Sequence, residues 1–288
     1  AGQVAVTAAG CGLSEGIPIS GIAGDQQASL FGQACLSEGM AKNTYGTGSF
    51  VLMNIGSTLP EPVDGLLSTV AWTLPGELVG AEAGTTVTHY ALEGAIFVTG
   101  AAVQWLRDGL GVIEHAAELG PLAESVPDSG GIVVVPAFTG LGSPWWDPYA
   151  RGTVLGISRG VGRAHLARAV IESMALQTRD VVDAMTAASG TPLIELRVDG
   201  GASVMDLLCQ FQADQLGVPV QRPLDQETTA LGAAFLAGIA EGVWASVDEV
   251  GEQWALDAEF TPADDRADAD ALHQQWLRAV ERSRNWAR

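Results

Sequence analysis

The feature that most constrains the fold is a set of three glycine-rich turns, each of which follows a short predicted strand. The three turns are Gly24-Asp25 after the apolar residues 17–23, Gly46-Thr47-Gly48 after residues 41–45, and Gly200-Gly201 after residues 194–198. A short strand pattern that ends at glycine is typical of a strand followed by a tight turn. Helical periodicity follows the first and the third turn, so the sequence predicts an α/β fold.

The predicted elements alternate along the chain, with no internal repeat. We expect strands at residues 17–24, 41–45, 49–54, 87–92, 132–136, 151–157, 194–198 and 218–222. We expect helices at residues 25–33, 93–108, 112–125, 164–185, 203–214 and 228–234, and an amphipathic helix at the carboxy terminus. The two strands around Gly46-Thr47-Gly48 form a predicted β-hairpin with a hydroxyl group at its tip.

Charge excludes several classes of partner. The chain has 34 acidic against 14 basic residues and a net charge of -20, which would repel nucleic-acid phosphates and anionic membrane surfaces. Lys42 is the only lysine, and its surroundings match neither the phosphate loop of P-loop enzymes nor the strand lysine of protein kinases. An anionic small molecule would therefore need backbone N–H groups or a metal ion.

Cysteine usage and hydropathy favour the cytoplasm. The three cysteines are widely spaced and form no Cys-x-x-Cys pair, which indicates neither a disulfide framework nor a zinc site. The four histidines are scattered singly, as surface or core histidines are. No stretch of about 20 apolar residues predicts a membrane span, and the chain starts without Met, which suggests part of a longer protein.

Asp25 is a candidate base. It lies in Gly24-Asp25-Gln26-Gln27, where a predicted strand meets a predicted helix. A carboxylate behind a glycine suits a general base or an anchor for a metal-bound water. The alternative is an ordinary helix cap, because aspartate is common at that position.

The other two turns are candidate phosphate or nucleotide sites. Glycines on both sides of Thr47 leave backbone N–H groups and one hydroxyl free to face a phosphate. Gly200 and Gly201 would let a nucleotide approach the amino end of the next helix, although the dinucleotide-binding fingerprint is not present. A plain hairpin turn and a tight packing turn are the alternatives. The tryptophans at residues 145–146 are interpreted as filling a core or an interface rather than stacking on a sugar.

Longer motifs resemble a known family. The run over residues 17–54, with Gly-Asp-Gln-Gln at 24–27 and Tyr-Gly-Thr-Gly at 45–48, resembles the glycerol kinases of the FGGY family of carbohydrate kinases. The resemblance continues through residues 91–94, 104–108, 136–142, 152–172 and 197–201. It implies an α/β, actin-like ATPase (ribonuclease H-like) domain in which helices flank a mixed sheet.

The resemblance also implies a division of the chain. Residues 1–40 would form the carboxy-terminal edge of the family's first, substrate domain, and residues 41–245 the second, nucleotide-binding domain. Residues 246–288 would form an acidic segment and a terminal helix packed on that domain. The family's amino-terminal phosphate loop and glycerol-binding aromatic residues have no counterpart here, so we expect an incomplete enzyme that is inactive alone.

The resemblance assigns residues to an ATP-dependent phosphorylation of glycerol to sn-glycerol 3-phosphate. Asp25 would be the catalytic base and would hold Mg²⁺ through water. Asp25, Gln26 and Phe50 would bind glycerol. The residues that would bind ATP or ADP are Thr47, Gly100, Gln104, Gly201 and Met205. Met205 departs from the asparagine that many relatives carry near the adenine.

Two alternatives to a glycerol kinase are open at this point. One is another polyol or sugar kinase of the same family, since the residues that choose the substrate are partly outside this sequence. The other is a non-catalytic nucleotide-binding module, which Met205 favours and the intact Asp25 and Thr47 disfavour. From the resemblance we also expect a cytoplasmic homo-oligomer that binds no nucleic acid and inserts into no membrane.

Overall fold

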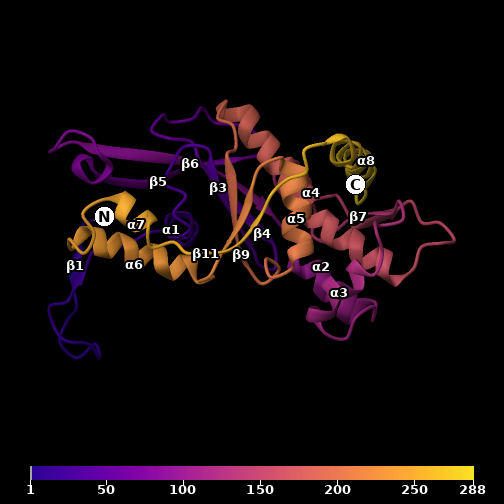
Figure 1. Cartoon of the computed structure of the whole chain (residues 1–288), viewed down its shortest axis with the longest axis horizontal. Coiled ribbons are helices and arrows are strands. Elements are labelled where there is room, and N and C mark those ends of the chain that lie inside the picture. The colour runs from indigo at the N-terminus through magenta and orange to yellow at the C-terminus, as the bar shows by residue number, and fades with distance from the viewer. Residues whose placement is uncertain (1) are drawn as a thin grey trace.

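The computed structural model describes residues 2–288, which fold around a seven-stranded mixed sheet (Figure 1). The strand order is β11-β10-β9-β3-β4-β6-β5. These strands are β3 (Met40–Tyr45), β4 (Ser49–Asn54), β5 (Leu67–Pro75), β6 (Thr86–Ile96), β9 (Glu195–Gly200), β10 (Val220–Pro223) and β11 (Leu256–Phe260). β9 runs parallel to both β3 and β10, and the remaining neighbours are antiparallel.

Helices cover both faces of the sheet, as the mixed α/β pattern predicts. α4 (Arg163–Ser189) and α5 (Asp206–Leu216) pack on one face, and α1 (Asp25–Gly32) and α6 (Thr228–Ala240) pack on the other (Figure 1). The side chains of β4 divide between them, since Val51 and Met53 join the core under α4 whereas Leu52 joins the core under α1. The period-two alternation of a strand thus places even-numbered residues of β4 toward α1.

α1 and α6 cross with their backbones in contact. A Cβ atom added to Gly32 would lie 1.9 Å from the Thr228 carbonyl oxygen, and one added to Gly232 would lie 1.8 Å from the Ala28 carbonyl oxygen. Only glycine fits at this crossing. The helix predicted at residues 228–234 is confirmed as part of α6, and no side chain caps its amino end.

Shorter elements surround the sheet. A loop layer beside β4 contains α2 (Gly100–Gln104), the π-helical turn η2 (Trp105–Gly109), the 3-10 turn η3 (Ala116–Glu118) and α3 (Leu119–Glu124). The other short elements are η1 (Gly76–Val79), α7 (Val247–Gly251) and two small antiparallel pairs, β1 (Ala5–Val6) with β2 (Pro18–Ile19) and β7 (Val133–Val135) with β8 (Thr153–Leu155). Among residues 2–288, no helix combines the length and hydropathy needed to cross a bilayer.

The terminal helix α8 (Ala267–Ser283) is fastened to α4 by one buried carboxylate. Asp180 accepts hydrogen bonds from the indole N–H of Trp276 at 2.7 Å and of Trp145 at 3.2 Å, and it contacts His273 Nε2 at 2.8 Å. Trp276 is fully buried. The interpretation of the two tryptophans as filling the core agrees with this contact of Trp145, whereas Trp146 is exposed.

Three sequence predictions were wrong. Residues 93–96 continue strand β6 instead of starting a helix, because β4 pairs with all four of them, β5 pairs with Glu93, and Gly94 packs against Val181. The strand predicted at residues 17–24 shrinks to Pro18–Ile19, and both residues are exposed. Only residues 116–124 of the helix predicted at 112–125 form helical turns. The sequence also missed β5, β11 and α7.

Candidate functional site

A cavity of about 750 Å³ opens beside the carboxy-terminal end of β3. Its walls are the β3–β4 turn, α2 with η2, η3 with α3, and the turn from β9 into α5. All five residues expected to bind nucleotide, Thr47, Gly100, Gln104, Gly201 and Met205, line this cavity. Its volume lies in the range of about 300–1,000 Å³ that is typical of small-molecule sites.

Close backbone contacts fix the β3–β4 turn. The Gly100 N–H donates to the Gly46 carbonyl at 3.0 Å, and the N–H groups of Thr99 and Ala101 donate to the Thr47 carbonyl at 3.0 Å. A Cβ atom on Gly100 would lie 2.5 Å from the Gly46 oxygen, so glycine is needed where α2 meets the turn. The hairpin tip is therefore held rigidly against the first residues of α2.

The β9–α5 turn presents an open backbone to the same cavity. Gly200 has φ +84° and passes so close to Tyr45 that a Cβ atom would lie 2.4 Å from its carbonyl oxygen. Gly201, in contrast, has no atom within 4 Å of the position of an added Cβ. Met205 precedes the first residue of α5. Arg107 is the basic residue on the wall, and it pairs with Asp108 at 2.7 Å, so an anion here would depend largely on backbone N–H groups.

The second group of predicted site residues lies at the amino end of α1. Asp25 is the first residue of that helix and is exposed, and its Oδ1 accepts the Gln26 backbone N–H at 2.9 Å. Phe50 is 39% exposed and lies opposite Thr44 in the β3–β4 pair. Gln26 accepts a hydrogen bond from Lys42 of β3, whose side chain lies on the same face of the sheet. The structure therefore brings Asp25, Gln26 and Phe50 to one side of the sheet.

Strand β3 connects the two groups, which do not share a cavity. Neither Asp25, Gln26 nor Phe50 lines the 750 Å³ cavity. The side chains of Lys42 and Thr44 point to Gln26 and α1, whereas Tyr45, at the end of the same strand, lines the cavity. A ligand in the cavity and a ligand beside Asp25 would lie at successive points along β3.

Sequence reasoning dismissed Lys42, which is fully buried next to the Asp25 group. Its ammonium donates to Gln26 Oε1 and, at 3.0 Å, to Thr44 Oγ1. Burial lowers the pKa of Lys42 to about 8, while the nearby carboxylates of Asp199, Glu93 and Asp25 oppose that shift. The signal that could have found it is a single lysine inside an otherwise uncharged strand.

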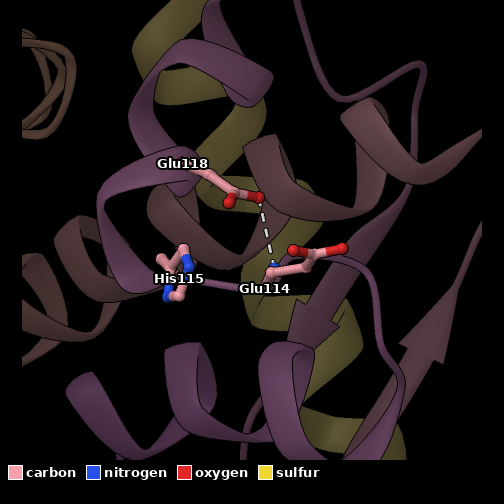
Figure 2. A group of neighbouring side chains, drawn as sticks. All are labelled: Glu114, His115 and Glu118. Atoms are coloured by element: carbon pink, nitrogen blue, oxygen red, sulfur yellow. Dashed lines mark hydrogen bonds between the residues drawn. The ribbon is translucent and has the colours of Figure 1, made fainter.

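A group of possible metal ligands lies on the turn that leads into α3. The exposed side chains of Glu114, His115 and Glu118 offer ligand atoms within 4.8 Å of one another. Figure 2 shows that Glu118 also accepts the Glu114 backbone N–H, at 3.2 Å. These residues sit on one short exposed turn, and no buried ligand atom points toward them among the described residues. We assign this group no role.

Comparison with other sequences identifies relatives over nearly the whole chain. Residues 41–241 match the carboxy-terminal domain of the FGGY family of carbohydrate kinases. A glycerol kinase of Symbiobacterium thermophilum is 57% identical over 275 residues, which are 96% of this chain and 53% of that protein. Glycerol kinase 2 of Thermotoga maritima is 56% identical over 94% of this chain and 52% of its own length. The chain thus spans about half the length of the curated relatives it matches.

Solved structures give the same result. A Plasmodium falciparum glycerol kinase with ADP has a TM-score of 0.85 and 34% identity, and the match covers 93% of this chain and 52% of that one. A xylulose kinase of Rhodospirillum rubrum has a TM-score of 0.79 and 26% identity over 96% of this chain and 55% of that one. The mixed sheet flanked by helices is the actin-like, ribonuclease-H-like α/β fold that the sequence motifs imply. The chain therefore belongs to the FGGY family of carbohydrate kinases.

Proposed function

We propose that this chain is the nucleotide-binding portion of a glycerol kinase, which transfers the γ-phosphoryl group of ATP to a terminal hydroxyl of glycerol and yields sn-glycerol 3-phosphate. The observation that carries the proposal is the cavity that Thr47, Gly100, Gln104, Gly201 and Met205 line together. Among the solved structures the identity is 34% to a glycerol kinase against 26% to a xylulose kinase, which supports glycerol over a sugar as substrate.

ATP would bind with its phosphates toward the β3–β4 turn. Backbone N–H groups around Gly46 and Thr47 and the Thr47 hydroxyl would face them, which suits a chain whose only lysine is buried elsewhere. Gly201 would let the nucleoside approach the amino end of α5, with Met205 and Gln104 beside it. Phosphoryl transfer depends mainly on alignment and electrostatic stabilisation, and these fixed turns supply alignment.

Asp25 would accept the proton of the attacking hydroxyl. One carboxylate oxygen is held by the Gln26 N–H, the other has no donor among residues 2–288, and the side chain is exposed. The alcohol releases its proton as the oxygen–phosphorus bond forms, so a carboxylate beside it can take that proton. Gln26 and Phe50 would hold the glycerol carbons and hydroxyls next to Asp25.

Mg²⁺ fits this donor set. It prefers oxygen ligands, keeps several waters, and is usually bound through one or two carboxylates and the substrate phosphates. The free oxygen of Asp25 would hold such an ion through a water molecule. Bound there, Mg²⁺ would neutralise negative charge on the phosphates.

We further propose that the protein is a cytoplasmic homo-oligomer.

The Asp25→Asn variant tests the proposed chemistry. It should be made in the product of the complete open reading frame that encodes this chain, and glycerol phosphorylation should be followed with MgATP. We expect kcat to fall by about 10²–10⁴-fold, the usual contribution of a general base, with MgADP affinity unchanged. Asp264→Asn, at an exposed position, is the matched control. Unchanged turnover in Asp25→Asn would favour a different mechanism, and wild type that binds MgADP without phosphorylating glycerol would favour a non-catalytic nucleotide-binding module.

A further inference from the structure

Lys42 begins a chain of buried polar groups that crosses the interior between β3, α1 and α6. Its ammonium donates to Thr44 Oγ1 at 3.0 Å, and Thr44 Oγ1 lies 3.4 Å from Ser29 Oγ. Ser29 Oγ lies 3.1 Å from Thr228 Oγ1, which donates to Asp199 Oδ2 at 2.5 Å. Three hydroxyl groups therefore connect a buried cation with a buried carboxylate.

The two ends of this chain fix the direction of every hydrogen bond in it. An ammonium group only donates and a carboxylate only accepts. Thr44 must therefore donate to Ser29, and Ser29 must donate to Thr228, so that each hydroxyl points toward Asp199. The Asp199 carboxylate is also held by Gln33 Nε2 at 2.7 Å. Charge-assisted bonds of this kind are stronger than neutral ones, and they hold the Lys42 ammonium in one position.

The remaining bond of Lys42 fixes the amide of Gln26. The ammonium group has no acceptor, so the Gln26 atom that faces it must be the carbonyl oxygen Oε1. The amide NH₂ group then points away from Lys42, and among the described residues it has no hydrogen-bond acceptor. Gln26 is half-buried and follows Asp25 directly, so the residue next to the candidate base carries this amide donor.

We infer that Lys42 is a positioning residue that holds Gln26 as a hydrogen-bond donor to a hydroxyl oxygen of the acceptor substrate. The inference rests on the proposed function, because it requires that an alcohol binds beside Asp25. Lys42 itself is fully buried and does not line the nucleotide cavity. It acts through Gln26, and the hydroxyl chain to Asp199 keeps it in place.

The test is a double-mutant cycle in the product of the complete open reading frame, with glycerol and MgATP as substrates. Lys42→Met keeps the length of the side chain and removes the donor group, so we expect KM for glycerol to rise about 10- to 100-fold, as for loss of a hydrogen bond of 1.4 to 2.8 kcal/mol, with kcat reduced less than tenfold. The Kd of MgADP should stay within twofold. In a Gln26→Ala background, Lys42→Met should raise KM no further.

Gln26→Glu removes the amide donor while keeping the size of the side chain. Glutamate retains the bond to Lys42 but cannot donate when ionised, so KM should rise as much as in Gln26→Ala. Thr178→Val, which removes the 3.0 Å bond to Asn43 on the opposite sheet face, is the control for general destabilisation and should leave KM unchanged. Thermal melts of each variant establish that it is folded.

Two results would overturn the inference alone. One is a Lys42→Met substitution that raises KM for glycerol by the same factor in the Gln26→Ala background as in wild type. The other is a Gln26→Glu variant with wild-type KM. Wild-type protein that binds MgADP and phosphorylates no glycerol would instead overturn the proposed function, and this inference with it.

Discussion

From the close crossing of α1 and α6 we predict that Gly232→Ala destabilises the folded chain. The new methyl group would lie 1.8 Å from the Ala28 carbonyl oxygen, whereas Cβ atoms essentially never come within 3.0 Å of such an atom. The obstacle is backbone, not a flexible side chain, so no rotamer change can relieve it. The two helices must separate by roughly an ångström, which is a case of overpacking.

The expected cost follows from that geometry. Overpacking costs about 1–3 kcal/mol, and this contact lies at the upper end because both helices are buried at the crossing. With about 2.1 cal/mol/K per residue, a chain of 288 residues has an unfolding entropy of about 0.6 kcal/mol/K, so about 3 kcal/mol lowers Tm by about 5 °C. Separation would also stretch the contacts of Thr228 with Ser29 and Asp199, and through them the site at the start of α1.

Differential scanning calorimetry of Gly232→Ala measures this cost. Gly160→Ala is the matched control, because the nearest atom to its added Cβ is 4.0 Å away. We expect the control to stay within about 0.5 kcal/mol of wild type. A Gly232→Ala variant as stable as the control would refute the conclusion that α1 and α6 are in backbone contact.

Three further outcomes follow from the structure. Asp180→Ala would leave the buried Trp276 indole and the His273 ring without their acceptor, and urea unfolding should show a loss of about 3–5 kcal/mol. The pKa of Lys42 is about 8 in the folded chain against an ordinary 10.5, so the unfolded chain binds more protons between these values. The free energy of unfolding should therefore rise from pH 8 to pH 10 relative to Lys42→Met, and an equal pH dependence in both would contradict this. Met205→Asn, which restores an amide to the cavity wall, should tighten MgADP binding by up to about tenfold in calorimetry, as one added hydrogen bond allows.

Local signals were sufficient for part of the fold. The hairpin around Gly46-Thr47-Gly48 and the long helix α4 were predicted because glycine turns and helical periodicity lie within a short stretch of sequence. The extension of β6 through Ile96 was not, because it depends on pairing with β4. β11 was missed for the same reason, since its exposed alternation becomes a strand only when paired with β10.

The candidate site divides in the same way. Five residues of the cavity wall were named from the sequence. The glycine turns indicated Thr47 and Gly201, and the family resemblance added Gly100, Gln104 and Met205. The hydroxyl chain was invisible, since Ser29 and Thr228 are 199 residues apart in sequence and neither belongs to a motif with a known role. Lys42 was judged only against phosphate-binding lysines, and its actual partner, Gln26, is set by the packing of α1 on β3.

Calorimetric titration of the 288-residue chain with MgADP tests the central claim most directly, because it asks whether the cavity is a nucleotide site. Gly201→Leu is the matched variant, since no atom lies within 4 Å of its added Cβ and the side chain would enter the cavity without disturbing the fold. We predict one MgADP bound per chain in wild type and none in Gly201→Leu, with both proteins folded. A folded wild-type chain that binds no MgADP, or a Gly201→Leu variant that binds it equally well, would contradict the account.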